Sequence, residues 1–435
     1  MDSLPVELLR LVLESCDAQS VRTLRLVCHS FAQVGYEYLI PPGFTALPWR
    51  DDVARLHSIA SHERLRASIQ SATFNFAELD EYNGRHTSYF QHFLEAPEDR
   101  TAALTDAWVR YAALEKRSRH VAAFESPEQA DAVREALGRL PNLSEIEVTF
   151  TRCPYNIDVV REVFENPSCR KIDTAQACKK LNVVISAMRL ARVSSFAVDR
   201  LPLELFRMPV DRKPWFEAAD AFARLTRLDV TLDPTNSIFP TAKLRSVHGF
   251  GLVLRQALNI THLSLAFHNY GFPRNKFLLM FDELLVDGFT FGKLTDLKLE
   301  GMGCVEEDLR DFLIRHGTLE RIRLGGRGLS KSYELAMGGI RLCRGTFRSL
   351  FASISKRLPR LQRLHMEGDF ESETLDRGAP ESYNFHPTAD DQWNDVTATA
   401  VRRVRSGKTT TDSLALERFV LEGGPYPCSR THRSD

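Results

Sequence analysis

A short apolar pattern, repeated along most of the chain, constrains its fold most strongly. In each copy an apolar residue is followed by a second one three positions later and by a third two positions after that. Between residues 193 and 319 successive copies begin 32, 35, 34 and 25 residues apart, enough for a strand, a turn and a helix. One strand and one helix cannot bury their own apolar faces, so each copy must stack on its neighbours. The pattern therefore predicts an α/β fold, a solenoid with a curved parallel sheet on its concave face.

Six copies fit the pattern closely and three fit it less well. The close fits are Leu143/Ile146/Val148, Leu225/Leu228/Val230, Ile260/Leu263/Leu265, Leu294/Leu297/Leu299, Leu319/Ile322/Leu324 and Leu361/Leu364/Met366. The weaker fits are Val193/Phe196/Val198, Leu416/Phe419/Leu421 and Ile69/Ala72/Phe74. After the copy that begins at Leu294, the sequence predicts a turn and then a helix over 306–316, which Gly317 ends. All of these apolar residues are expected to be structural.

Residues that alternate with the apolar positions are expected to point to the concave face of the solenoid. They include Glu145, Glu147, Arg227, Asp229, His262, Ser264, Asp296, Lys298 and His365. Toward the C-terminal end they are mainly arginines, namely Arg321, Arg323, Arg363 and Arg418. Guanidinium groups bind carboxylates and phosphates through paired hydrogen bonds. These four arginines are therefore predicted substrate-binding residues for an acidic or phosphorylated target; the alternative is an ordinary solvated strand face.

The first 45 residues are predicted to form a separate unit of three short helices. The first helix opens at Leu4-Pro5-Val6-Glu7, where proline is tolerated and an acidic residue suits the positive helix end. The second begins near Ala18 or Ser20, the third contains Phe31, and Pro41-Pro42-Gly43 ends the unit. So small a unit has little interior. Part of its apolar surface is therefore expected to contact another chain.

Two motifs of this unit resemble the F-box. They are Leu4-Pro5-x-Glu7-Leu8 and Leu24-x-x-Val27-Cys28-x-x-Phe31, and with the repeats they resemble F-box proteins with irregular leucine-rich repeats, as found in filamentous fungi. Phe31 stands where many F-boxes carry tryptophan and keeps the aromatic bulk. The resemblance implies docking onto a Skp-type adaptor through Leu4, Pro5, Glu7, Leu8, Leu11, Val12, Leu24, Val27, Cys28 and Phe31. The alternative is that these residues form the core of a small helical cap.

Between and after the clear repeats the sequence is less regular. Residues 46–140 are expected to hold a helical linker and irregular first repeats, with helices near 101–120 and 127–137, and Ser126 as the N-cap of the second. The solenoid proper is expected over 141–425, interrupted by a polar loop at about 368–391. Residues 426–435 are expected to be a frayed tail.

Composition excludes several classes of protein. The chain has 435 residues with 57 Lys+Arg and 57 Asp+Glu, so no basic excess favours nucleic acid as a partner. It has no apolar run long enough for a membrane span, and its start does not resemble a secretory signal. The eight cysteines are scattered without a C-x-x-C pair, which is typical of buried thiols in a reducing compartment. A cytoplasmic or nuclear location is expected.

No motif points to catalysis, a metal or a cofactor. Gly407-Lys408-Thr409 matches only the end of a phosphate loop, because Arg402 stands where the first glycine is required. The histidine pairs lack the spacing of a zinc site. By the resemblance, the chain is expected to be a non-catalytic substrate receptor, bound through the adaptor to the cullin of a ubiquitin ligase, with a protein substrate on its repeats. The alternative is an interaction scaffold that binds the adaptor without a cullin.

Overall fold

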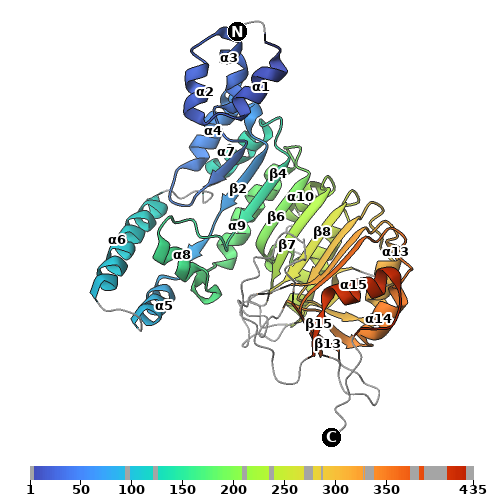
Figure 1. The fold of residues 1–435 in the computed structure, drawn as a ribbon. Helices are drawn as coiled ribbons and strands as arrows, with labels where there is room; N and C mark the ends of the chain where they lie inside the picture. Colours follow the sequence, from blue (N-terminus) through green and yellow to red (C-terminus); the bar gives the residue numbers. More distant parts are fainter. Residues whose placement is uncertain are drawn as a thin grey trace. The chain divides into compact units, whose positions relative to one another are not determined.

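The computed structural model describes residues 4–93, 98–120, 126–207, 213–234, 240–268, 278–285, 288–326, 328, 338–372, 382–386 and 409–427. The chain divides into two compact units, Met1–Val198 (unit 1) and Asp199–Asp435 (unit 2). Each unit combines parallel strands with helices (Figure 1). Strand β6 (Ser195–Pro202) runs across the division, which therefore falls inside the region where the sequence predicts one solenoid.

Unit 1 begins with a cluster of short helices. They are α1 (Val6–Glu14), α2 (Ala18–Leu24) and α3 (His29–Val34), followed by the 3₁₀ helix η1 (Gly35–Tyr38). The Asp17 carboxylate caps α2 by accepting a hydrogen bond from the Ser20 backbone N–H at 2.7 Å. Leu9, Leu13, Val21, Phe31 and Val34 form a small separate core. The cluster is thus held together by five buried side chains, with Leu24, Cys28 and Tyr38 among those packed partly buried against them.

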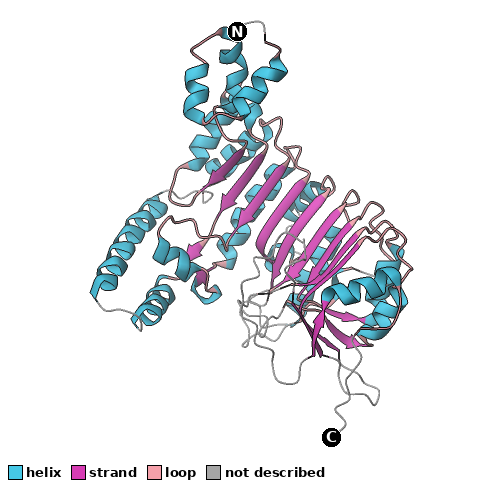
Figure 2. Cartoon of the chain, in the orientation of Figure 1, coloured by secondary structure: helices cyan, strands magenta, loops and turns pink. Residues whose placement is uncertain are grey.

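A parallel sheet follows in unit 1. Its strands lie in the order β1 (Gly43–Ala46), β2 (Ser71–Asn75), β4 (Glu145–Thr149) and β6, all parallel (Figure 2). The predicted apolar residues Ala72, Ile146 and Phe196 lie in register across three of these strands and are buried. Helices α4 (Asp52–Ser61), α7 (Pro127–Gly138) and α9 (Thr174–Met188) pack together, α7 against both others. Ser126 is the N-cap of α7, as predicted, accepting from the Gln129 N–H at 3.3 Å.

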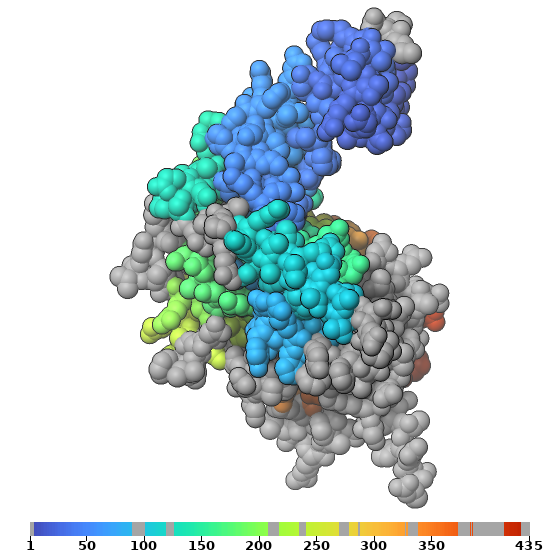
Figure 3. All heavy atoms as spheres, turned by 90° about the vertical axis from the view of Figure 1, so that its left-hand side faces the viewer, coloured from blue at the N-terminus to red at the C-terminus, as the bar shows by residue number. Residues whose placement is uncertain are grey.

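A second core lies beside this sheet. It contains Trp108, Tyr111, Tyr155 and Phe164 and joins α6 (Glu98–His120) to α8 (Asp158–Phe164). Helix α6 was expected from the sequence, whereas α5 (Glu81–Phe93) was not. Figure 3 shows α5 and α6 side by side on one face of unit 1. Two further short strands, β3 (Glu78–Leu79) and β5 (Arg170–Lys171), pair antiparallel next to this core.

Five strands of unit 2 lie side by side, parallel and in chain order. These are β7 (Arg227–Asp233), β8 (His262–Phe267), β9 (Asp296–Glu300), β11 (Arg321–Gly325) and β13 (Arg363–Ser372). They alternate with helices α10 (Lys213–Phe222), α11 (Pro240–Leu254), α12 (Phe281–Leu284), α13 (Glu306–Arg315) and α14 (Phe347–Ile354). One residue from each strand enters a buried row, namely Leu228, Leu263, Leu297, Ile322 and Leu364. Every strong copy of the pattern therefore falls on a strand at the expected place.

The prediction of a polar loop at about 368–391 is wrong in part. Strand β13 continues to Ser372, and β14 (Ser382–His386) pairs antiparallel with it. Phe370 and Phe385 stack edge to face across this pair, with ring centroids 4.8 Å apart. Two buried aromatic rings therefore anchor a segment whose overall polarity suggested a loop. Residues 373–381 and 387–391 lie outside the described part of the chain.

Other strands complete this end of unit 2. Strand β10 (Gly303–Val305), where a turn was expected, pairs with β12 (Arg341–Arg344), which also pairs with β13. Strand β15 (Thr409–Asp412) pairs with β14. Of the predicted tail, Tyr426 packs edge to face on Phe419 at 5.3 Å, and residues 428–435 are outside the described part.

The copy predicted at Leu416/Phe419/Leu421 is not a strand. These residues belong to helix α15 (Ser413–Glu422). Leu416 and Val420, four residues apart, bury one side of this helix. An apolar run this short fits a helical period as well as an alternating one, so the sequence pattern alone could not separate the two.

A buried histidine ends helix α13. His316 is 1% exposed, and its Nε2 accepts a hydrogen bond from the Phe291 backbone N–H at 2.9 Å. Its Nδ1 lies 2.7 Å from the Phe312 carbonyl oxygen, so the Nδ1–H donates and the ring is neutral. Burial lowers the pKa of His316.

This histidine makes unit 2 sensitive to acid. In the unfolded chain the imidazole of His316 binds a proton with a pKa near 6.5, whereas in the folded chain its pKa is lower. The contribution of His316 to stability is therefore fully present above about pH 6.5 and is lost as the pH falls below that value. We expect the free energy of unfolding to fall by up to about 1.4 kcal/mol per pH unit from this group. Urea unfolding followed by circular dichroism at pH 7.5, 6.0 and 5.0 measures this loss of stability.

Two histidine variants assign the effect. The His316→Gln variant should lose this part of the pH dependence, and the exposed His86→Gln control should keep it. Parallel profiles for the native chain and His316→Gln would contradict the assignment.

Candidate functional site

Helix α1 carries apolar side chains on two sides. Leu9 and Leu13 point into the small core and are 1% exposed. Leu8 and Leu11 are 46% and 61% exposed, and Leu4, Pro5 and Val12 are also exposed. We call Leu4, Pro5, Leu8, Leu11 and Val12 the α1 surface. Exposed apolar side chains gathered on one short helix are typical of a contact with another protein.

Polar contacts fix α1 against the 3₁₀ helix η1. The Arg10 guanidinium forms an ion pair with Glu37 at 3.0 Å, and the Tyr38 hydroxyl donates to the Glu14 carboxylate at 3.3 Å. Both contacts join α1 to residues near the end of the helix cluster. The exposed pair contributes little to stability by itself. Together with the buried Leu9 and Leu13, however, these contacts keep the α1 surface turned outward.

The other predicted docking residues divide into three groups. Glu7 and Val27 are exposed, and Leu24 and Cys28 are half-buried against the small core. Phe31 is 3% exposed and belongs to that core, so its aromatic bulk packs inside the unit and it is not available as a contact. Sequence reasoning missed Val6 and Leu26, which are exposed beside the predicted residues. Their apolar character was visible, but the direction in which they point was not.

Each strand arginine of the predicted stripe has a carboxylate partner, and substrate binding by these residues stays a prediction. Arg321 pairs with Asp296 on the neighbouring strand. Arg323 is 5% exposed and donates to Glu367 at 2.7 Å. Arg363 pairs with Glu417 of α15 at 2.8 Å. Arg418 is exposed on α15, a helix, and so does not share a strand face with the others.

The same strand face contains a hollow of about 220 Å³. Its floor is formed by residues in register on four strands, which include Arg227, Asp229, His262, Ser264, Asp296 and Lys298. Asp296 also contacts His262 at 3.2 Å. Arginine and lysine side chains thus lie beside aspartates on this face. A surface of this kind suits a partner with mixed charges better than a purely acidic one.

A buried carboxylate continues this network along β9. Lys298 and His268 contact Glu300 at 2.9 and 3.0 Å. Burial alone raises the pKa of Glu300, but the contacts from Lys298 and His268 outweigh it and hold the pKa well below its usual range. Glu300 also accepts from the Gly328 backbone N–H at 2.9 Å. The negative charge of Glu300 is therefore balanced by contacts within the protein.

The described residues show no cluster of three or more histidine, cysteine or acidic side chains that could hold a metal ion. None of the helices in the described ranges has the length and apolarity that crossing a membrane requires. The seven cysteines of that part of the chain form no disulfide with one another. Residues 401–408, which include most of the incomplete phosphate-loop motif, lie outside it.

Two arginines on one strand test the ion-pair assignment. Arg323→Ala leaves Glu367 buried without its guanidinium, and we expect it to lower the free energy of unfolding by about 3 kcal/mol or more. Arg321→Ala removes a pair whose guanidinium is about half exposed, and it should cost about 1 kcal/mol. Urea unfolding of both variants measures the difference. Equal losses would mean that Arg323 is not held in a buried pair.

Comparison with known families identifies one part of the chain. The model of the F-box domain matches residues 1–34, which contain α1, α2 and α3. No curated protein matches the chain. F-box domains bind Skp-type adaptors, and F-box proteins are typically non-catalytic receptor subunits of ubiquitin ligases. Residues 1–34, with the exposed α1 surface, are therefore an F-box domain.

Proposed function

We propose that this chain is the substrate-recognition subunit of a ubiquitin ligase of the Skp-cullin-F-box type. The α1 surface carries the proposal, because it is the apolar, outward-facing part of a domain whose class binds Skp-type adaptors. Leu8 and Leu11 are the main contacts in this assignment. Leu4, Pro5, Val12 and Val27 extend them.

Residues beyond the F-box domain hold the substrate in this proposal. The in-register apolar rows and the alternation of strands with helices support a leucine-rich-repeat solenoid. In such an array each strand adds one row of outward side chains, and adjacent rows make an extended binding face. The hollow on β7, β8, β9 and β11 is the proposed place of contact with a protein substrate, through mixed charges.

The proposed mechanism is positioning alone. An adaptor holds the F-box domain, the cullin holds the adaptor, and the substrate is held near a ubiquitin-carrying enzyme. Binding two partners at once raises the effective concentration of one near the other and needs no catalytic group in this chain. In this proposal the protein acts in the cytoplasm or nucleus.

Two substitutions on the α1 surface test adaptor binding. Leu8→Arg with Leu11→Arg places two charges where apolar contact is proposed, and we expect binding of a recombinant Skp-type adaptor to weaken about 100-fold or more. Leu258→Arg is the matched control, because Leu258 is 59% exposed and lies in unit 2. Biolayer interferometry measures affinity, and circular dichroism checks folding. Unchanged affinity in a folded double variant would show that α1 is not the docking helix.

The cullin is tested by isolating the complex from cells. Recovery of the adaptor together with a cullin, both lost in the double variant, is the expected result. Recovery of the adaptor without a cullin would instead favour a non-degradative scaffold.

A further inference from the structure

A cavity of about 240 Å³ lies in unit 1, apart from the α1 surface and from the hollow in unit 2. It is placed where β1 and β2 end, and Ala46 and Asn75, the last residues of these strands, line it. Helices α4, α6, α7 and α9 supply other walls. In sheets of parallel strands the space beyond the carboxyl ends is where ligands commonly bind, because neighbouring loops diverge there.

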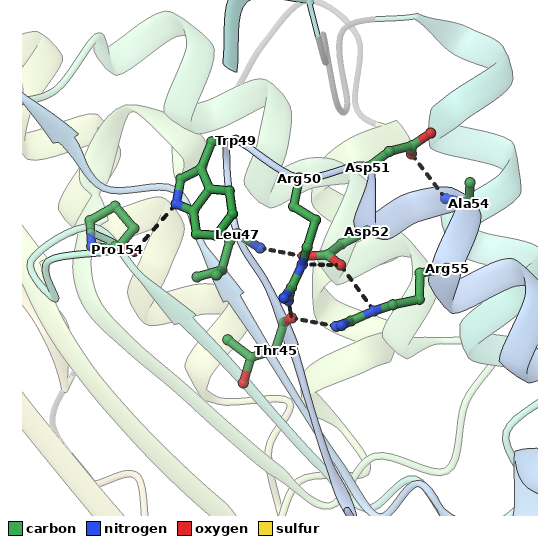
Figure 4. A network of polar contacts seen from close by, with 9 residues as sticks. All are labelled: Thr45, Leu47, Trp49, Arg50, Asp51, Asp52, Ala54, Arg55 and Pro154. Atoms are coloured by element: carbon green, nitrogen blue, oxygen red, sulfur yellow. Dashed lines mark hydrogen bonds and ion pairs between the residues drawn. The ribbon is translucent and has the colours of Figure 1, made fainter. Parts of the chain in front are cut away.

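Hydrogen bonds hold one rim of the cavity in place (Figure 4). Asp52 is 3% exposed and accepts from the Leu47 backbone N–H at 2.8 Å and from Arg50 at 2.7 Å. Arg50 and Arg55 both donate to the carbonyl oxygen of Thr45. The segment after β1 is thereby closed into a tight loop, so a ligand would not have to order it on binding.

A second contact ties this loop to another wall. The Trp49 indole N–H donates to the carbonyl oxygen of Pro154 at 3.3 Å (Figure 4). Pro154 precedes Tyr155, whose side chain lines the cavity. This hydrogen bond fixes the positions of two segments that are about a hundred residues apart in sequence. The cavity is therefore preformed and does not require a bound ligand.

Four aromatic side chains form part of the cavity wall. Phe74, Phe76, Tyr111 and Tyr155 line it, and the two tyrosine rings meet nearly edge to face at 5.0 Å. Burial raises the pKa of both tyrosines, so their hydroxyls stay neutral at physiological pH. The cavity thus offers apolar walls to a ring and neutral hydroxyl groups to a hydrogen-bonding substituent.

The charged groups around the cavity cancel. Three cations line it, namely Arg50, Lys171 and Lys180. Three carboxylates match them, namely Asp52, Glu78 and Glu115. Arg50 contacts Asp52 at 2.7 Å, and Lys180 contacts Glu78 at 3.2 Å. A charged ligand entering this space would break one of these two pairs or upset the equal number of positive and negative groups in the lining, and both are unfavourable.

We propose that this cavity binds a small, uncharged aromatic molecule carrying one hydrogen-bonding group. Aromatic walls and cancelled charge together select against both acids and amines of the same shape. The volume lies below the range of about 300–1,000 Å³ typical of drug-sized ligands, so the ligand is about one ring with a short chain. This proposal is independent of the proposed binding of a Skp-type adaptor.

Three probes that differ only in their end group test the proposal on the full chain. They are 3-phenylpropanol, 3-phenylpropionate and 3-phenylpropylamine. Isothermal titration calorimetry measures affinity, and thermal unfolding measures stabilisation by the bound probe. The alcohol is expected to bind with about millimolar affinity and at least about tenfold more tightly than either charged probe. No binding of the alcohol, or tighter binding of a charged probe, overturns the proposal.

Two variants that change the charge of the lining in opposite directions should shift the probe preference in opposite directions. Lys180→Gln leaves the carboxylates in excess and should shift preference toward the amine. Glu115→Gln leaves the cations in excess and should shift it toward the propionate. Lys179→Gln is the control for the first, because Lys179 is exposed on the same helix and does not line the cavity. Unshifted preference in both charge variants would place the probe elsewhere and overturn the assignment.

A cavity-filling variant provides a check that is independent of charge. Val133 lines the cavity from α7, and Val133→Phe should abolish binding of 3-phenylpropanol by occupying its place. If this variant unfolds, the Lys180 and Glu115 variants still decide the question. A folded Val133→Phe variant that binds the alcohol normally contradicts the site.

Discussion

The parallel stacking of apolar side chains in register supports the rest of the protein. Strands β7, β8, β9, β11 and β13 each contribute one residue to the row of Leu228, Leu263, Leu297, Ile322 and Leu364, and all five are buried. A single strand and helix cannot exclude water from these side chains, and only a neighbour on each side can. The free energy of each repeat therefore depends on the next one, and the side chains between the apolar positions are placed as a consequence.

Register also explains the charges of the strand face. Opposite signs meet where Arg321 lies opposite Asp296. Two positions further along, Lys298 lies opposite Arg323, and these cations find their carboxylates elsewhere, Lys298 at Glu300. Arg323 reaches Glu367 on the next strand and is buried with it. Burying an arginine without a carboxylate would cost several kcal/mol, so these pairs are needed once the strands are stacked. The face that results is mixed in charge, with Arg227, Lys298, Arg321 and Arg323 beside Asp229 and Asp296 around the hollow.

The helix cluster at the N-terminus, unlike the strands of unit 2, leaves part of its apolar surface exposed. Its core holds Leu9, Leu13, Val21, Phe31 and Val34, and a unit of this size has no room for more. Leu8 and Leu11 must then lie outside. In unit 1 the same limits of space leave a cavity where strands end and helices α4, α6 and α9 do not fill the gap. Sequence reasoning did not find this cavity, because its walls come from segments as far apart as Ala46 and Lys180.

The sequence by itself determined the strong strands, the helices over 101–120 and 127–137, and an N-terminal unit with more apolar surface than interior. These features follow from local periodicity and from length, which depend only on residues that are close together in the sequence. Only the tertiary structure decided that Leu416 lies on a helix, that Phe370 and Phe385 pair two strands, and that Arg323 is internal. Each of these depends on a partner distant in sequence, since burial and charge pairing are properties of contacts that chain position alone does not specify.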